Sequence, residues 1–220
     1  MKIKHLKIHN FRCFGSEEKI IDLDDLTTLI GINSCGKTAV LNALMKLFGR
    51  SASVRALERA DFHVPKGKQP EEMTVQDLYV EAVISFQELN DDAENAKNTI
   101  PIAFEHMYVD KPGGDPYVRI RLEGKWSSGN TPEGDIDQNY FFITCPEAPG
   151  EIPANHKKPA TSSDLAKIEF VYVPAIRNPS MQLRNASGTI LWRILNGINW
   201  PGEINQQIKT LGKDLDKQFG

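Results

Sequence analysis

Alternation of apolar and polar residues predicts three strands in the middle of the chain. Residues 78–86 (LYVEAVISF), 118–122 and 139–144 (NYFFIT) carry this alternation, and the turn-rich sequence KPGGDP lies at 111–116. A period of two is typical of a strand with one buried face. We therefore expect an antiparallel β lobe at about 77–144 with one face in contact with water.

Two more strands and a helix are predicted before this lobe. Residues 2–11 predict a half-exposed, edge-like strand, and residues 26–31 (LTTLIG) predict a second strand. Beyond them, apolar residues recur at helical spacing at Val40, Leu41, Leu44, Leu47 and Phe48. Gly49 follows as a C-terminal stop. The predicted order is strand, strand, glycine-rich turn and helix.

After the lobe, the pattern changes from strands to helices. Residues 145–165, rich in Pro, Ala, Ser and Lys, predict a linker, and IEFVYV at 168–173 predicts a buried central strand. Apolar stripes at helical spacing follow over 191–198 and 204–219, separated by Trp200-Pro201. The last stripe has no apolar partner in the sequence, which indicates a fragment of a longer protein or docking on another subunit.

The turn before the first helix matches a phosphate-binding sequence. Residues 31–38 (GINSCGKT) fit G-x-x-x-x-G-K-[ST] at every position, between a predicted strand and a predicted helix. Glycines let backbone N–H groups turn inward toward a phosphate, and the helix adds its positive N-terminal end. The pattern predicts that Lys37 reaches the β- and γ-phosphate oxygens of ATP and that the Thr38 hydroxyl ligates Mg²⁺.

The rest of the loop is expected to bind the nucleotide mainly through its main chain. These candidate positions are Gly31, Asn33, Ser34, Cys35 and Gly36. An accidental match in a chain of 220 residues has a probability on the order of 1%. Nucleotide binding is therefore preferred over an ordinary strand–turn–helix connection, and no separate role is assigned to Cys35.

Composition excludes several other classes of protein. The net charge of −3 provides no overall basic field for nucleic acid, and three cysteines without a C-x-x-C pair do not predict a disulfide framework or a zinc site. The N-terminus lacks the apolar region of a signal peptide, and no apolar run approaches membrane-spanning length. We expect a soluble, cytoplasmic protein without membrane contact.

The N-terminal region resembles a known group of ATPases. LKIHNFRCF at 6–14, followed by LTTLIGINSCGKTAVLNAL at 26–44, is similar to the N-terminus of SMC/RecF-like ATPases of the ABC type. Within that group, DFHVP at 61–65, LYVEAVISF and FVYVPAIRNPS at 170–180 most resemble the OLD family. The resemblance implies an α/β fold, an ABC-type P-loop ATPase half with a mixed sheet and an antiparallel β lobe. It also implies a complete protein with a C-terminal Toprim nuclease, often in anti-phage defence.

The resemblance extends to residues outside the loop. Asn10, Phe11 and Arg12 match a family turn that lies beside the nucleotide, where a guanidinium can contact phosphate oxygens. The strand at 168–173 would precede a glutamine that senses Mg²⁺ and the γ-phosphate, and Gln182 is the first candidate for it. Arg177 would face nucleotide or DNA, or form a surface ion pair. Residues 1–199 would then be the N-terminal part of the ATPase domain, and 200–220 the start of a helical dimerisation or insertion segment.

Several parts of such an enzyme are missing from the sequence. No apolar strand ends in Asp-Glu, no suitably placed switch histidine follows the loop, and NASGTI at 185–190 is a poor ABC signature. The D-x-D at 135–137 lies in a predicted solvated loop and is not expected to be a nuclease centre. We therefore expect the chain to bind MgATP, and its hydrolysis to need a homodimer or higher oligomer of a longer protein that acts on DNA. A RecF/SMC-like repair ATPase without a nuclease and a non-hydrolysing interaction module are the alternatives.

Overall fold

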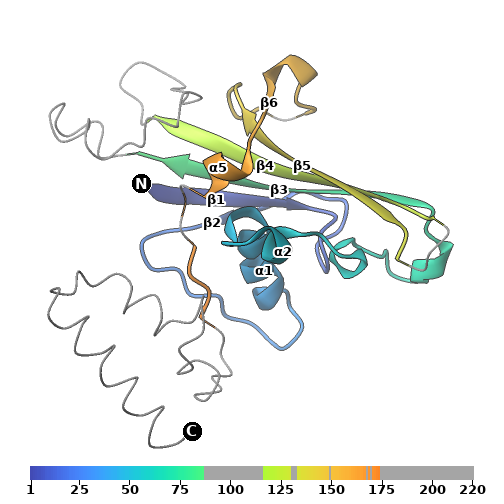
Figure 1. Cartoon of the computed structure of the whole chain (residues 1–220). Coiled ribbons are helices and arrows are strands. Elements are labelled where there is room, and N and C mark those ends of the chain that lie inside the picture. Colours follow the sequence, from blue (N-terminus) through green and yellow to red (C-terminus); the bar gives the residue numbers. More distant parts are fainter. Residues whose placement is uncertain (87–115, 130–132, 149, 167, 169, 174–220) are drawn as a thin grey trace, which may run out of the picture. The chain divides into compact units, whose positions relative to one another are not determined.

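The computed structural model describes residues 1–86, 116–129, 133–148, 150–166, 168 and 170–173 (Figure 1). The chain divides into two compact units, Met1–Tyr172 and Val173–Gly220. All of the second unit except Val173 lies outside the described residues, and so do the helices predicted over 191–198 and 204–219.

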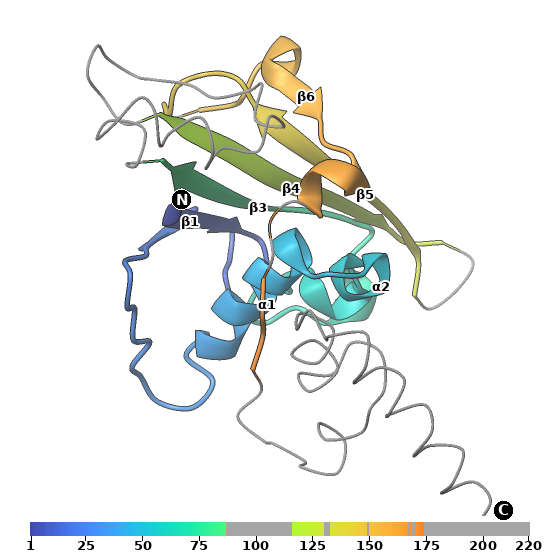
Figure 2. The same cartoon turned by 60° about the vertical axis from the view of Figure 1, so that its left-hand side comes forward.

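A six-stranded antiparallel sheet forms the centre of the described unit, with the strand order β2-β1-β3-β4-β5-β6 (Figures 1 and 2). Its strands are β1 (Lys2–His9), β2 (Lys19–Asp22), β3 (Val75–Ser85), β4 (Tyr117–Ser127), β5 (Asp135–Ile143) and β6 (Lys157–Pro159). Every pairing between them is antiparallel. The three alternating runs of the sequence are β3, β4 and β5, so the expected antiparallel lobe is confirmed.

One face of this sheet is apolar and is covered by helix α1 (Lys37–Phe48). Leu6 and Ile8 of β1, together with Val80 of β3, are fully buried in the same core as Ala43 and Leu47 of the helix. In Figure 2, α1 and the short helix α2 (Ala52–Arg55) lie on the same side of the sheet. The helix predicted from apolar spacing therefore forms as expected, and its stripe is the surface that packs on the strands.

The other face of the sheet carries charged residues that alternate in sign from strand to strand. Lys7 of β1 stands opposite Glu81 of β3, which stands opposite Arg121 of β4. Glu81 is fully buried and accepts hydrogen bonds from Arg119 Nε at 2.8 Å and Arg121 Nε at 2.6 Å. Burial of these charges is tolerated because each has an opposite charge in direct contact.

Part of the segment predicted as a linker covers this charged face. Arg119 Nη1 donates to the carbonyl oxygens of Cys145 and Pro146, at 2.9 and 2.8 Å. The Glu147 carboxylate lies 2.7 Å from His5 Nε2 and 2.8 Å from Lys7 Nζ. Burial by itself would raise the pKa of Glu147, but the hydrogen bonds from His5 and Lys7 outweigh it and lower the pKa to about 2.

The remainder of residues 145–165 is also structured, which corrects the linker prediction. It contains the 3-10 helix η3 (Ala154–His156), strand β6 and helix α5 (Ser162–Leu165). Thr161 and Asp164 form a capping box at the start of α5, and Leu165 is buried in the core. A composition rich in Pro, Ser and Lys did not indicate this, because capping and burial depend on where the segment meets the sheet.

Two predicted strands are not formed. Residues 26–31 and 170–173 belong to no strand and pair with none among the described residues. Leu26 is 87% and Ile30 is 90% exposed, whereas Leu29 is partly buried against the core. An apolar run becomes a strand only when a neighbouring strand supplies hydrogen bonds, and the neighbour is not in the described part of the chain.

The D-x-D sequence also differs from its prediction. Asp135 and Asp137 belong to β5, opposite Ser127 and Lys125 of β4, instead of lying in a loop. Pairing with β4 extends the strand beyond the apolar run at its C-terminal half. Three short elements, α2 and the 3-10 helices η1 (Arg59–Asp61) and η2 (Pro70–Glu72), connect α1 to β3.

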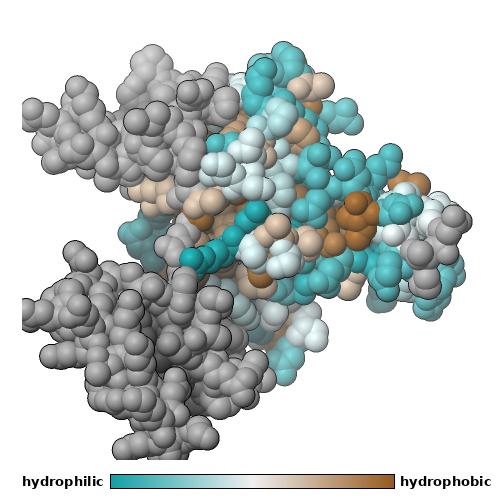
Figure 3. Space-filling model, viewed as in Figure 1, coloured by the Kyte–Doolittle hydropathy of each residue, from teal (hydrophilic) through white to brown (hydrophobic). Residues whose placement is uncertain are grey.

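The surface of the described unit is predominantly polar in the view of Figure 3, with hydrophobic residues in smaller patches between hydrophilic ones. None of the helices in the described part of the chain is long and apolar enough to cross a membrane.

Glu147 gives the charged face a testable dependence on pH. Because folding lowers its pKa, the ionised carboxylate stabilises the protein at pH values above its unfolded pKa of about 4.5, and this contribution is lost as the pH falls toward 2. We expect Glu147→Gln to lower the free energy of unfolding near pH 7 but much less near pH 2, as measured by urea denaturation. The exposed Glu151→Gln is the control. A difference between Glu147→Gln and the wild type that stays constant from pH 7 to pH 2 would contradict the role of this ion pair.

Candidate phosphate-binding site

The loop at 31–36 turns tightly in front of α1, which begins at Lys37. Ser34 and Gly36 have φ angles of 67° and 103°, in the left-handed region that favours glycine. A Cβ atom on Gly31 would lie 2.5 Å from the Cys35 sulfur, so the two ends of the loop meet without room for a side chain at Gly31. Each glycine of the sequence pattern thus meets a local constraint: Gly31 lies close to the Cys35 side chain, and Gly36 has a positive φ.

Lys37 extends back over this loop. Its ammonium nitrogen donates to the carbonyl oxygens of Gly31 and Ile32, at 2.7 and 2.8 Å, and lies 3.8 Å from the Cys35 sulfur. Phosphate oxygens can take the place of these carbonyl oxygens as acceptors. The ammonium therefore lies at the mouth of the loop that the sequence predicts to hold phosphate.

The start of α1 suits an anion. Its first turn has no acidic residue, and no side chain caps its N-terminal N–H groups. These unpaired N–H groups and the helix dipole both attract negative charge. Thr38 is exposed on this first turn, as are residues 31–35 of the loop, so its hydroxyl is accessible to a hydrated metal ion bound to phosphate.

The turn after β1 lies beside the loop. Asn10 and Arg12 have φ angles of 51° and 52°, and Asn10 N–H donates to Gly15 O at 2.9 Å. A Cβ atom on Gly36 would lie 3.0 Å from the Cys13 sulfur and 3.3 Å from the Phe14 ring. The structure therefore brings together two sequence segments that are more than 20 residues apart.

Arg12 is bound to a residue that the sequence analysis did not select. Its Nε and Nη2 atoms both lie 2.8 Å from Asp61 Oδ1. Asp61 is fully buried, and its other oxygen lies 3.1 Å from Lys46 Nζ and 3.0 Å from the Glu58 backbone nitrogen. Asp61 belongs to the DFHVP sequence that carried the family resemblance, but its partner is 49 residues away, so no local spacing could identify it.

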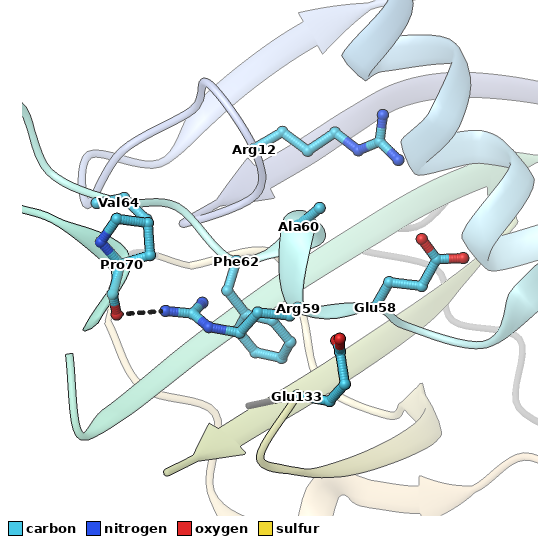
Figure 4. Close-up of a pocket in the computed structure, with 8 residues that line it drawn as sticks. All are labelled: Arg12, Glu58, Arg59, Ala60, Phe62, Val64, Pro70 and Glu133. Atoms are coloured by element: carbon cyan, nitrogen blue, oxygen red, sulfur yellow. Dashed lines mark hydrogen bonds between the residues drawn. The ribbon is translucent and has the colours of Figure 1, made fainter. Parts of the chain in front are cut away.

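A cavity of about 710 Å³ opens next to Arg12 (Figure 4). The residues that line it are Arg12, Glu58, Arg59, Ala60, Phe62, Val64, Pro70 and Glu133. The Arg59 guanidinium lies 3.8 Å from the centre of the Trp126 ring, and its Nη2 donates to Pro70 O at 3.2 Å. Its Nη1 atom is buried and has no hydrogen-bond partner. The lining combines four apolar residues with two arginines and two glutamates, and the volume of the cavity is in the range of small-molecule sites.

Two expected site residues remain untested. Arg177 and Gln182 lie outside the described residues. Within the described ranges, no group of three or more His, Cys, Asp or Glu side chains could hold a metal ion, and the acids of the D-x-D belong to no such group.

Comparison with known proteins identifies relatives of this chain. The family described as "AAA ATPase domain" matches residues 1–179. The chromosome partition protein Smc of Fusobacterium nucleatum subsp. nucleatum is 26% identical over 113 residues, which cover 50% of this chain and 10% of that protein. The chain thus spans about one tenth of the length of this curated relative.

Solved structures of SMC heads are also similar. One, from work on ATP-driven dimerisation and DNA-stimulated activation of SMC ATPases, is 14% identical with a TM-score of 0.42, covering 76% of this chain and 77% of that one. Another, an Smc head bound to the C-terminal winged-helix domain of ScpA, is 16% identical with a TM-score of 0.43, covering 76% and 40%.

The loop geometry predicts the effect of a side chain at Gly36. Gly36→Ala imposes a left-handed φ on alanine, which costs about 1 kcal/mol, and brings its Cβ against Cys13. Gly67→Ala is a matched control, because Gly67 has a φ of 88° but no atom within 4 Å of an added Cβ. We expect urea denaturation to show a larger loss of unfolding free energy for Gly36→Ala. Equal losses would mean that the turn after β1 does not pack against the loop.

Proposed function

The chain belongs to the AAA ATPase domain family, and on that premise we propose that it binds MgATP through residues 31–38. The observation that carries the proposal is the position of the Lys37 ammonium, held by two loop carbonyls at the mouth of a glycine turn. An ammonium and a helix N-terminus without acidic residues in its first turn together match the charge of a polyphosphate.

Each residue has a definite part in this proposal. The N–H groups of Asn33 to Gly36 bind the β-phosphate, and Lys37 exchanges its carbonyl acceptors for β- and γ-phosphate oxygens. The Thr38 hydroxyl ligates Mg²⁺, which when bound neutralises charge on the phosphates. Arg12, on the adjacent turn, adds a second cation at the phosphates, and Asn10 and Phe11 hold that turn in place.

We propose that the complete protein is an OLD-family ATP-dependent DNA endonuclease and that this chain is its ATP-binding N-terminal portion. The sequences DFHVP, LYVEAVISF and FVYVPAIRNPS support this assignment. With it we propose an anti-phage role in the cytoplasm and assembly as a homodimer or higher oligomer. A RecF/SMC-like repair ATPase without nuclease is the second candidate, and the match to chromosome partition protein Smc favours it. DNA cleavage by the complete protein would decide between them.

Hydrolysis is proposed to require segments that lie beyond the described residues. The stretch 26–30, which leads into the loop, exposes the side chains of Leu26 and Ile30 and pairs with no strand in the described part. A strand from the rest of the protein would cover these side chains and fix the base of the loop. The same segments would bring the carboxylates that hold Mg²⁺ and polarise water.

Nucleotide binding is tested by thermal unfolding. We expect MgATP at 100 times its dissociation constant to stabilise the wild type by about 2.7 kcal/mol. Lys37→Ala should abolish this stabilisation because the β- and γ-phosphates lose their ammonium. Lys66→Ala removes an exposed lysine with the same charge and serves as control. Equal temperature shifts for Lys37→Ala and the wild type would place the nucleotide elsewhere.

Turnover distinguishes the short chain from the complete protein. We expect residues 1–220 to bind MgATP but to release negligible phosphate, and the complete protein to hydrolyse ATP in a Lys37-dependent manner. Phosphate release measured by a coupled assay tests both. Sustained Lys37-dependent hydrolysis by the short chain as a monomer would contradict the need for further segments. Absence of turnover in the complete protein would favour a non-hydrolysing interaction module.

A further inference from the structure

The buried ion pair between Asp61 and Arg12 suggests a role beyond stability. We propose that Asp61 is a positioning residue, which holds the Arg12 guanidinium in the orientation that contacts nucleotide phosphates. The inference rests on the proposed binding of MgATP at 31–38. It adds a residue that the phosphate-loop pattern does not contain.

The Asp61 carboxylate is itself immobilised. Arg12 Nε donates to Oδ1 at 2.8 Å, and Arg12 Nη2 lies at the same distance from this oxygen. The Glu58 N–H donates to Oδ2 at 3.0 Å, and Lys46 Nζ lies 3.1 Å from it. The side chain is completely buried, so water does not compete for these contacts. A carboxylate held on each oxygen by a hydrogen bond and an ion pair restrains the orientation of the guanidinium that it binds.

The backbone on both sides of the pair is held as well. Arg12 N–H donates to Asp61 O at 2.8 Å, His63 N–H donates to Asn10 O at 2.9 Å, and His63 Nδ1 lies 2.7 Å from Arg12 O. Phe11 and Phe62 form an isolated antiparallel bridge between the same segments. Asn10 and Arg12 keep left-handed φ angles inside this frame. Such angles persist in non-glycine residues only where the surroundings determine them, and they concentrate at functional sites.

The two cations bound to Asp61 differ in their exposure. Arg12 and Lys46 contribute two positive charges and Asp61 contributes one negative charge, while the exposed Glu58 lines the same cavity as Arg12. Lys46 is buried and also donates to Ala56 O, whereas the Arg12 side chain is 33% exposed. Of these two cations, Arg12 is therefore the one that a ligand can reach, and it belongs to the turn that touches Gly36. Since Asp61 engages Nε and Nη2, Nη1 is available to a phosphate oxygen.

Affinity for MgATP, measured by isothermal titration of the 220-residue chain, tests this role. We expect Arg12→Ala and Asp61→Asn each to weaken binding at least about tenfold, as for loss of a hydrogen bond to a charged group. The double variant should be no weaker than Arg12→Ala alone, because Asp61 acts through Arg12. Lys46→Met removes one contact of the same carboxylate but leaves the contact between Arg12 and Asp61 in place. It should lower the melting temperature and weaken binding less than Asp61→Asn does.

Arg12→Lys keeps the test decisive if Asp61→Asn does not fold. Lysine retains the charge but cannot place two nitrogens at one carboxylate oxygen while presenting a third to phosphate. The loss of MgATP affinity in Arg12→Lys should therefore equal that in Arg12→Ala. Wild-type affinity in Arg12→Lys would overturn the proposal, as would additive losses in the double variant or an equal loss in Lys46→Met. Lys37→Ala in the same titration separates the two hypotheses. If Lys37→Ala abolishes binding while Arg12→Ala and Asp61→Asn bind normally, the phosphate site is supported and the positioning role of Asp61 is contradicted. A wild type that does not bind MgATP contradicts both hypotheses.

Discussion

Burial of the apolar stripe of α1 against the antiparallel sheet is the interaction on which the rest of the site depends. Ala43 and Leu47 are completely buried in one core with Leu6 and Val80 of the sheet. This packing fixes the axis of the helix and therefore the position of its N-terminus. Because the phosphate loop is simply the chain that enters this helix, its place relative to the sheet follows from hydrophobic burial. The loop residues themselves remain exposed and free to bind.

A second constraint is electrostatic and connects three segments to one carboxylate. Asp61 joins the turn after β1 through Arg12, helix α1 through Lys46 and its own 3-10 helix through the Glu58 N–H. The interior has a low dielectric, so an unpaired carboxylate would be costly there and two cations make its burial possible. The arrangement couples the helix that carries the loop to the turn that touches Gly36. The other buried carboxylate, Glu81, lies on the face of the sheet away from α1. Its ion pairs with Arg119 and Arg121 stabilise the sheet.

The sequence by itself determined the features that depend on neighbouring residues. The spacing of Gly31, Gly36 and Lys37 predicts a phosphate loop because each residue acts on the backbone within a few positions of itself. Alternation located β3, β4 and β5, and helical spacing located α1, because both patterns report burial of one face of a regular element. Family resemblance predicts that residues 10–12 lie beside the nucleotide, and the structure places the neighbouring Cys13 and Phe14 against Gly36.

The tertiary structure decided which apolar and polar residues found partners. The run at 26–31 has the composition of a strand but forms none, since no neighbouring strand lies among the described residues, and its Leu26 and Ile30 remain exposed. Conversely, the polar Asp135 and Asp137 lie in a strand because β4 offers them hydrogen bonds. Asp61 has no pattern in the sequence that marks it, and it became recognisable only when folding brought it to Arg12. Local sequence specifies backbone preference and chemistry, whereas pairing across long separations depends on packing that no short window of sequence contains.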